Sequence, residues 1–356
     1  MKRFSNLTVL VLVWFLTLGA GPNPNQNVPK KDGDAESTAV KPINFQPLRV
    51  VYRQVEGTYL KSPRGVWVDK AKDEVYVADT LNDLVAVYDG KGLPLFAFGY
   101  NQELKEPSKA VADSKGRIFV LNGIPRVIKI FNYRGEYLND FALSRKDPKS
   151  YPNAIAVDGQ GNVYVALANE TGAKIQIYDP MFQLVREFGD KPDGAGYFKS
   201  VQAIAIDSDG TIYVSDANAA PSIQVFSPDG KYLRGWGAHD AGPMNFSLPA
   251  GLAIDGDGRV IVVDSLRHTI TVFTKEGTFL GRHGGMGSQP GAVAAPTDIA
   301  TNGNKKIYVV ERLGSRLQVL EERLVAARGN AIAAAAANGV REQLRRQFSD
   351  FTKGMK

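Results

Sequence analysis

Acidic residues recur at regular intervals in this sequence, and they are the first groups that could perform chemistry. Five short apolar runs each end in an aspartate, at successive spacings of 44, 45, 49 and 48 residues: Asp69, Asp113, Asp158, Asp207 and Asp255. Carboxylates at equivalent positions of a repeat could bind metal ions. However, an aspartate before a tight turn usually accepts hydrogen bonds from the backbone N–H groups of that turn. We therefore expect turn-forming aspartates. The same interpretation applies to four further acidic residues: Asp79, Asp216, Asp264 and Glu311.

Other metal-binding residues are scarce. The chain has no cysteine and three histidines, His239, His268 and His283. Thiolate sites and disulfides are therefore excluded, and a zinc site held by several histidines is disfavoured. The polar residues at the positions that enter each first strand also offer no set of nucleophile, base and orienting residue of the kind that hydrolysis needs. We expect no cofactor.

The aspartates belong to a repeat that determines the architecture. The segments 75–99 and 212–237 share an aromatic-Val pair, an aspartate, a β-branched run, an Asp-Gly turn and a closing aromatic-Gly pair. Six such copies of roughly 46 residues each contain short strands joined by tight turns. This pattern is typical of a β-propeller, in which each blade buries its faces against its neighbours. We predict an all-β, six-bladed β-propeller of four-stranded antiparallel blades over residues 45–324.

The two ends of the repeat region indicate how the ring closes. The sixth copy ends at "SRLQVLEERL", Ser315 to Leu324, without a fourth strand of its own. The segment "LRVVYRQVEG", Leu48 to Gly57, precedes the first copy and has the pattern of a lone fourth strand. We therefore expect the N-terminal strand to complete the sixth blade, which would remove an open sheet edge.

Within each copy the motif resembles the NHL repeat. The matching pattern is Pro-x-Gly-apolar-Ala-Val-Asp, then Tyr-Val-Ala-Asp-x-x-Asn and a strand ending in Phe-Gly; Tyr76, Asp79 and Asn82 carry it in the first copy. Copies two and three depart from it, with Asn122 and Leu167 in place of the aspartate. The resemblance covers residues 48–320 and implies a six-bladed propeller. It names no single function, because NHL propellers include RNA-binding, protein-binding, enzymatic and sensor members.

The segments outside the repeats predict export. Residues 1–20 have the layout of a secretory signal peptide, with an uncleaved anchor as the alternative. Residues 21–44 are polar and predict a flexible linker, and residues 325–356 predict a helical basic tail. We expect an exported protein, periplasmic or associated with the cell envelope, that contacts membrane only through an uncleaved signal or weakly through the tail.

The charge distribution argues against nucleic-acid binding. Residues 45–320 contain 31 Lys and Arg against 30 Asp and Glu, so the positive excess of the chain lies outside the repeats. A nucleic-acid-binding face normally concentrates basic residues. We therefore expect no nucleic-acid partner.

Candidate binding residues lie where each copy enters its first strand. In a propeller these positions surround one mouth of the central channel, and here they are polar and of mixed charge: Arg64, Lys109, Asn153, Gln202 and Asp298. Such a ring suits a polar, oriented partner segment. We expect a monomeric, non-catalytic scaffold that binds an envelope protein, peptide or ligand through this mouth.

The alternative to the scaffold is a metal-dependent lactonase- or lyase-like propeller enzyme. Gluconolactonase-like propellers hold a divalent ion on the axis with Glu, Asn and Asp side chains. In this sequence Asp298 is the one acidic residue at a corresponding position.

Overall fold

The structure is a computed structural model, and it describes residues 43–100, 103–189, 195–240, 242 and 244–324. The predicted signal peptide, nearly all of the predicted linker and the predicted C-terminal helix lie outside these residues. No helix among the described residues is long and apolar enough to cross a membrane. Residues 43 and 44, assigned to the linker from sequence, belong to the first strand instead.

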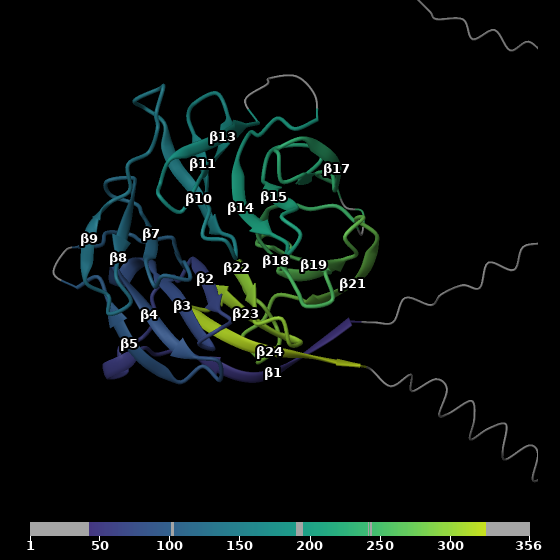
Figure 1. Cartoon of the computed structure of the whole chain (residues 1–356). Helices are drawn as coiled ribbons and strands as arrows, with labels where there is room; N and C mark the ends of the chain where they lie inside the picture. The colour runs from purple at the N-terminus through teal and green to yellow at the C-terminus, as the bar shows by residue number, and fades with distance from the viewer. Residues whose placement is uncertain (1–42, 101–102, 190–194, 241, 243, 325–356) are drawn as a thin grey trace, which may run out of the picture. The chain divides into compact units, whose positions relative to one another are not determined.

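The described residues form a six-bladed β-propeller, as predicted, and each blade is a four-stranded antiparallel sheet (Figure 1). Blade 1 contains β2 (Gly65–Asp69), β3 (Glu74–Asp79), β4 (Leu84–Asp89) and β5 (Pro94–Phe98). Blade 2 contains β6 (Lys109–Ala112), β7 (Ile118–Asn122), β8 (Val127–Phe131) and β9 (Tyr137–Asp140). Blade 3 contains β10 (Tyr151–Val157), β11 (Val163–Ala168), β12 (Ala173–Tyr178) and β13 (Leu184–Phe188).

The remaining blades follow the same order. Blade 4 contains β14 (Val201–Ile206), β15 (Ile212–Asp216), β16 (Ile223–Phe226) and β17 (Tyr232–Trp236). Blade 5 contains β18 (Pro249–Ile254), β19 (Val260–Asp264), β20 (Thr269–Phe273) and β21 (Phe279–Gly284). Blade 6 contains β22 (Pro296–Thr301), β23 (Lys306–Glu311), β24 (Arg316–Leu324) and β1 (Ile43–Val51). Two short 3-10 helices are η1 (Val55–Gly57) and η2 (Thr80–Asn82).

The N-terminal strand closes the ring as predicted. β1 pairs antiparallel with β24, from Ile43 opposite Leu324 to Val51 opposite Leu317. The strand begins at Ile43, earlier than the predicted start at Leu48. The extension follows from Phe45, which is 1% exposed and packs in the apolar cluster between blades 5 and 6.

Apolar packing lies between the blades. Six buried clusters each join the facing sheets of two neighbouring blades. Middle strands such as β3 and β19 are therefore buried on both faces, which explains their continuous apolar sequences. This arrangement holds the six inner strands, β2, β6, β10, β14, β18 and β22, around the central axis, where each contacts the next.

Candidate functional site

The six inner strands define two ends of the central axis. Their first residues lie at one end, here called the upper end, together with the loops that join the second and third strands of each blade. Their last residues and the following turns lie at the opposite, lower end. All five predicted binding positions lie directly before an inner strand or among its first three residues, so they belong to the upper end.

Two of the five predicted residues meet in an ion pair across blades. Lys109, the first residue of β6, reaches past blade 1, and its Nζ pairs with the Oδ2 of Asp298 on β22 of blade 6. The side chain of Asp298 is 6% exposed and that of Lys109 is 21% exposed. Val66 of β2 lies between them: its C=O accepts from Lys109 Nζ at 2.8 Å, and its N–H donates to Asp298 Oδ2 at 2.9 Å. Backbone groups of β2, in blade 1, thus hold both members of the pair, which come from the two neighbouring blades.

Glycines make room for this pair. A Cβ on Gly65 would lie 2.3 Å from the Ser108 carbonyl oxygen and 2.8 Å from Lys109 Cα. A Cβ on Gly251 would lie 2.7 Å from both Cα and Oδ1 of Asp298. Both approaches are closer than real Cβ atoms allow, so the absence of side chains at Gly65 and Gly251 lets the neighbouring strands bring Lys109 and Asp298 to the axis.

The other three predicted residues do not join the pair. Arg64 is exposed, and its backbone N–H donates to Ala78 O at 3.1 Å. Asn153 is also exposed and donates through Nδ2 to the carbonyl of Val201 on the next inner strand. Gln202 is half-buried and donates to the backbone and hydroxyl oxygens of Ser200. Their role in binding stays a prediction.

The acidic residues that end the second strands connect loops at the upper end, as predicted. Asp216 accepts from the backbone N–H groups of Lys199 and Ser200 in the loop entering its own blade and of Asn218 and Ala219 in its own turn. Asp264 makes the equivalent set of bonds in blade 5. These carboxylates fix the loops that surround the upper mouth.

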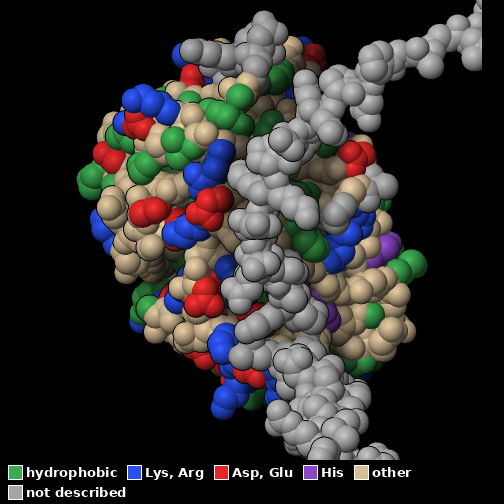
Figure 2. All heavy atoms as spheres, turned by 90° about the vertical axis from the view of Figure 1, so that its right-hand side faces the viewer, with side chains coloured by type: hydrophobic (Ala, Val, Ile, Leu, Met, Phe, Trp, Pro, Cys, Tyr) green, Lys and Arg blue, Asp and Glu red, His purple; other side chains and the backbone are tan. Residues whose placement is uncertain are grey.

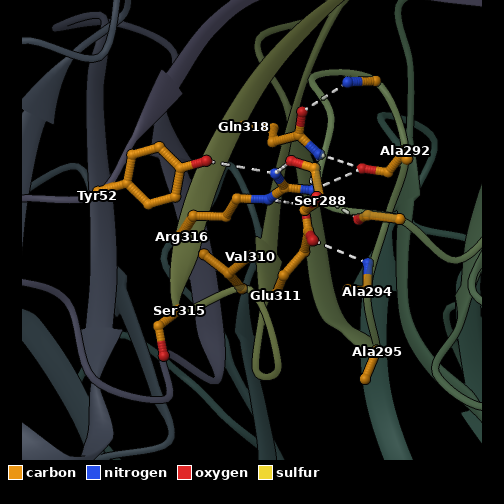
Figure 3. Close-up of polar contacts among 12 residues, drawn as sticks. Tyr52, Ser288, Ala292, Ala294, Ala295, Val310, Glu311, Ser315, Arg316 and Gln318 are labelled. Carbon is orange, nitrogen blue, oxygen red and sulfur yellow. Dashed lines mark hydrogen bonds and ion pairs between the residues drawn. The ribbon is translucent and has the colours of Figure 1, made fainter.

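In blade 6 the acid of this connection pairs with a buried arginine (Figure 3). Glu311, 0% exposed, accepts from Arg316 Nε at 2.9 Å, from Gln318 Nε2 at 2.5 Å and from the Ala294 N–H at 2.8 Å. Arg316, 1% exposed, also donates to the carbonyl oxygens of Ser288 and Ala292. The network ties the loop before β22 to β23 and β24.

One of the loop-fixing acids should give the fold a pH dependence. Burial raises the pKa of Asp79 to about 6, although Asn82 and the Lys61 N–H donate to it. Because this pKa is above that of the unfolded chain, the folded state binds more protons between about pH 4 and pH 6, and the free energy of unfolding falls as pH rises through that window. A carboxyl pKa of about 6 in place of its ordinary value corresponds to a change of about 3 kcal/mol in the free energy of unfolding.

Asp79→Asn, which cannot ionise, should lack this contribution. Urea unfolding of the wild type and the variant between pH 4 and pH 7 gives the free energy of unfolding of each protein at each pH. The contribution of Asp79 is the change with pH in the difference between these two free energies. A difference that stays constant across the pH range would contradict the assigned pKa.

The aspartates that end the inner strands form turns at the lower end, in agreement with the sequence. Asp113 accepts from the N–H groups of Lys115 and Arg117 and pairs with the Arg117 guanidinium at 2.6 Å. Asp255 makes the same contacts with its own turn and with Arg259. Asp158 accepts from the backbone N–H groups of Gln160 and Asn162. It also accepts from two side-chain donors, Asn162 Nδ2 and the Tyr164 hydroxyl.

A cavity of about 990 Å³ opens at this lower end, away from the predicted binding residues. It is lined by the last residues of five inner strands and the turns that follow them, including Trp67, Lys70 and Lys115, and by Lys275 in the turn between β20 and β21. Sequence reasoning placed the binding site at the upper end and missed this cavity. The available signal was the apolar residue before each strand-ending aspartate, to which the sequence analysis assigned no role.

A divalent metal does not fit the upper end. The positions that enter the six inner strands supply one carboxylate, Asp298, and its Oδ2 is bound by the Lys109 ammonium and by an N–H group. Among the described residues no three His, Cys, Asp or Glu side chains group as metal ligands. The histidines instead contact backbone groups at separate places: His239 with Ala219 O, His268 with the Ala295 N–H, and His283, on β21, with Gly291 O. The charged groups at the upper end of the axis therefore form an ion pair and do not form a metal site.

Comparison with known sequences identifies the repeat. A family model for the NHL repeat matches residues 246–273, which contain β18, β19 and β20. The chain is an NHL-repeat β-propeller. The Drosophila melanogaster protein Brain tumor is 28% identical to this NHL-repeat propeller over 141 residues, which cover 38% of this chain and 13% of that protein. The match thus spans a small part of that relative.

Solved structures with the same fold include enzymes. A gluconolactonase from Xanthomonas campestris is similar with a TM-score of 0.58 at 15% identity, covering 80% of this chain and 92% of the other. A streptogramin B lyase is similar with a TM-score of 0.55 at 15% identity, covering 79% of this chain and 98% of the other. A luciferin-regenerating enzyme is similar with a TM-score of 0.57 at 12% identity, covering 80% of this chain and 96% of the other.

These neighbours overturn the expected function. The sequence favoured a non-catalytic scaffold, whereas the similar propellers are enzymes by name, so the scaffold interpretation is wrong. Identities of 12 to 15% establish a shared fold, and an enzymatic role is compatible with it.

Proposed function

We propose that this NHL-repeat propeller is a lactonase- or lyase-like enzyme that acts on a polar small molecule at the upper end of its axis. The observation that carries the proposal is the Lys109–Asp298 pair, in which two opposite charges from blades 2 and 6 are positioned on Val66 of blade 1. Support also comes from the enzymes that share this fold. Unlike the alternative drawn from the sequence, the proposal assigns no role to a metal.

The pair has the groups that the opening of a cyclic ester requires. In hydrolysis, water adds to the carbonyl carbon and loses its proton to the Asp298 carboxylate, while the Lys109 ammonium stabilises the oxyanion that forms. The ring C–O bond then breaks, and the leaving oxygen takes the proton back from Asp298. In elimination, Asp298 instead removes a proton from the carbon next to the one that carries the ring oxygen. The alkyl C–O bond then breaks rather than the acyl C–O bond, so that a C=C double bond forms and a carboxylate leaves, with no water added.

Glucono-δ-lactone and streptogramin B are suitable probes for the purified full chain. Proton release at constant pH, above the spontaneous rate, measures opening of the first. Mass spectrometry distinguishes hydrolysis, which adds one water, from elimination, which leaves the mass unchanged. We expect turnover of at least one cyclic ester, and we expect it to persist in the presence of EDTA.

Asp298→Asn should lower kcat by a factor of about 100 or more, because general acid–base groups typically contribute 10²- to 10⁴-fold. Asp83→Asn is the matched control: Asp83 also pairs with a lysine at the upper end, Lys105, but its side chain is 32% exposed. An Asp298→Asn variant with a normal melting curve and wild-type kcat would refute the assigned site. Absence of turnover on both probes and on a panel of other lactones would refute the function.

Location is a separate proposal. We propose that the enzyme acts outside the cytoplasm, on the basis of the signal-like residues 1–20. Cell fractionation of a C-terminally labelled chain tests this.

A further inference from the structure

The cavity at the lower end is large enough for a small organic molecule. Its volume of about 990 Å³ is at the upper end of the range of about 300 to 1,000 Å³ found for ligand pockets. The cavity lies at the opposite end of the axis from Lys109 and Asp298, and neither of these two residues lines it. The proposed catalytic pair therefore does not account for it.

The inner part of the cavity is apolar. Each contributing inner strand presents the residue before its terminal aspartate: Val68, Ala112, Val157, Ile206 and Ile254. We call these five residues the apolar collar. Val157 and Ile206 are only half-buried, and so is Trp67, whose ring lies 5.5 Å from that of Tyr76. Half-buried apolar and aromatic side chains inside a concave site favour a ligand with an apolar body.

The acidic groups of the lining are largely occupied. Asp113, Asp158 and Asp255 accept hydrogen bonds from their own turns, and Arg117 and Arg259 pair with two of them. Asp257 remains on the rim in blade 5, with its side chain 73% exposed and 3.7 Å from Arg259. On the side of blades 1 and 2 the carboxylates are therefore not available to a ligand.

Of the four lysines that line the cavity, Lys70 and Lys115 remain available to a ligand. Lys72 pairs with Asp69 at 3.6 Å, and Lys275 pairs with Asp207 at 2.5 Å. Lys70 and Lys115 line the cavity, are exposed, and have no ion-pair partner in the part of the chain that the structure describes. The rim next to blades 1 and 2 therefore offers two ammonium groups to an anion.

We propose that the lower cavity binds an amphipathic organic anion, with its apolar body against the apolar collar and Trp67 and its carboxylate or sulfonate between Lys70 and Lys115. This site is independent of the proposed catalytic function, since it uses other residues at the other end of the axis. Neither observation alone specifies the ligand. An apolar collar beneath two unpaired ammonium groups requires both an apolar body and a negative charge.

Anilinonaphthalene sulfonate is the probe, because it combines an aromatic body with a sulfonate and becomes fluorescent in apolar sites. Titrated into the native full chain, it should bind saturably and with one site. N-phenylnaphthylamine, which has nearly the same body without the charge, should bind at least 5-fold more weakly. Because this assay contains no lactone, its outcome does not depend on the proposed catalytic activity.

Lys70→Ala/Lys115→Ala should weaken binding of the sulfonate by 10-fold or more and leave binding of the uncharged analogue unchanged. The matched control is Lys91→Ala/Lys231→Ala, which removes the same charge from two other turns at the lower end that do not line the cavity. If both double variants weaken binding equally, general electrostatic attraction explains the result and the site is refuted.

Trp67 reports the position of the probe. Energy transfer from tryptophan to the bound sulfonate should fall by more than half in Trp67→Phe, while Trp236→Phe, in the cluster between blades 4 and 5, should change it less. Transfer that does not depend on Trp67 would place the probe elsewhere and overturn the proposal. Cooperative melting of each variant excludes probe binding to partly unfolded chains.

Discussion

A chain that starts at residue 52, and so lacks β1, should aggregate or lose cooperative melting, whereas a chain that starts at residue 43 should fold as the full protein does. β1 provides the outer strand of blade 6 and pairs with β24 from Ile43 to Val51. It also buries Phe45 and Val51, which are 1% and 7% exposed, in the clusters on both sides of blade 6.

The expected loss has two physical causes. Without β1 the whole length of β24 becomes an exposed edge, and long unprotected edges pair with other chains. Exposing Phe45 and Val51 also removes burial that contributes about 1.5 to 3 kcal/mol for each side chain.

Light scattering and thermal melting of the two truncated chains measure this effect. Charged side chains of both signs are interspersed on the side of the molecule shown in Figure 2. β24 itself carries Glu321, Glu322 and Arg323, so charge repulsion should not protect the exposed edge. A chain beginning at residue 52 that stays soluble with an unchanged melting curve would show that the ring does not depend on β1.

Arg316→Met should lower the free energy of unfolding by about 3 to 5 kcal/mol, the typical result of removing one partner of a buried ion pair. Met has a similar length but no charge, so Glu311, 0% exposed, would lose its cation. The carbonyl groups of Ser288 and Ala292 would also lose their donor.

Two further variants separate the causes. Arg316→Met/Glu311→Gln should recover part of the loss, since no unpaired charge remains. Arg323→Met removes a guanidinium that pairs with Glu321 at 3.6 Å but is 64% exposed, and it should cost less than about 1 kcal/mol. Denaturant unfolding of the four proteins gives the comparison. Equal effects of Arg316→Met and Arg323→Met would contradict a role for burial.

The sequence was sufficient for the fold because the fold depends on local and repeated features. The apolar run, the turn aspartate and the Asp-Gly turns act within a few residues of one another, and six copies make the pattern unambiguous. Asp79, Asp216 and Asp264 were predicted to accept backbone N–H groups for the same reason, and they do. Closure by the N-terminal strand followed from the missing fourth strand of the last copy.

The candidate site required tertiary structure because its groups are distant in the chain. Lys109 and Asp298 are 189 residues apart, and their contact depends on close approach of strands at Gly65 and Gly251. Sequence alone placed both at one mouth but could not show that they neutralise each other, which removes the one carboxylate that an axial metal would need. The lower cavity was also beyond the sequence: whether the apolar residue before each aspartate is core or cavity wall depends on how closely six inner strands approach the axis, and that distance is determined by packing between all the blades.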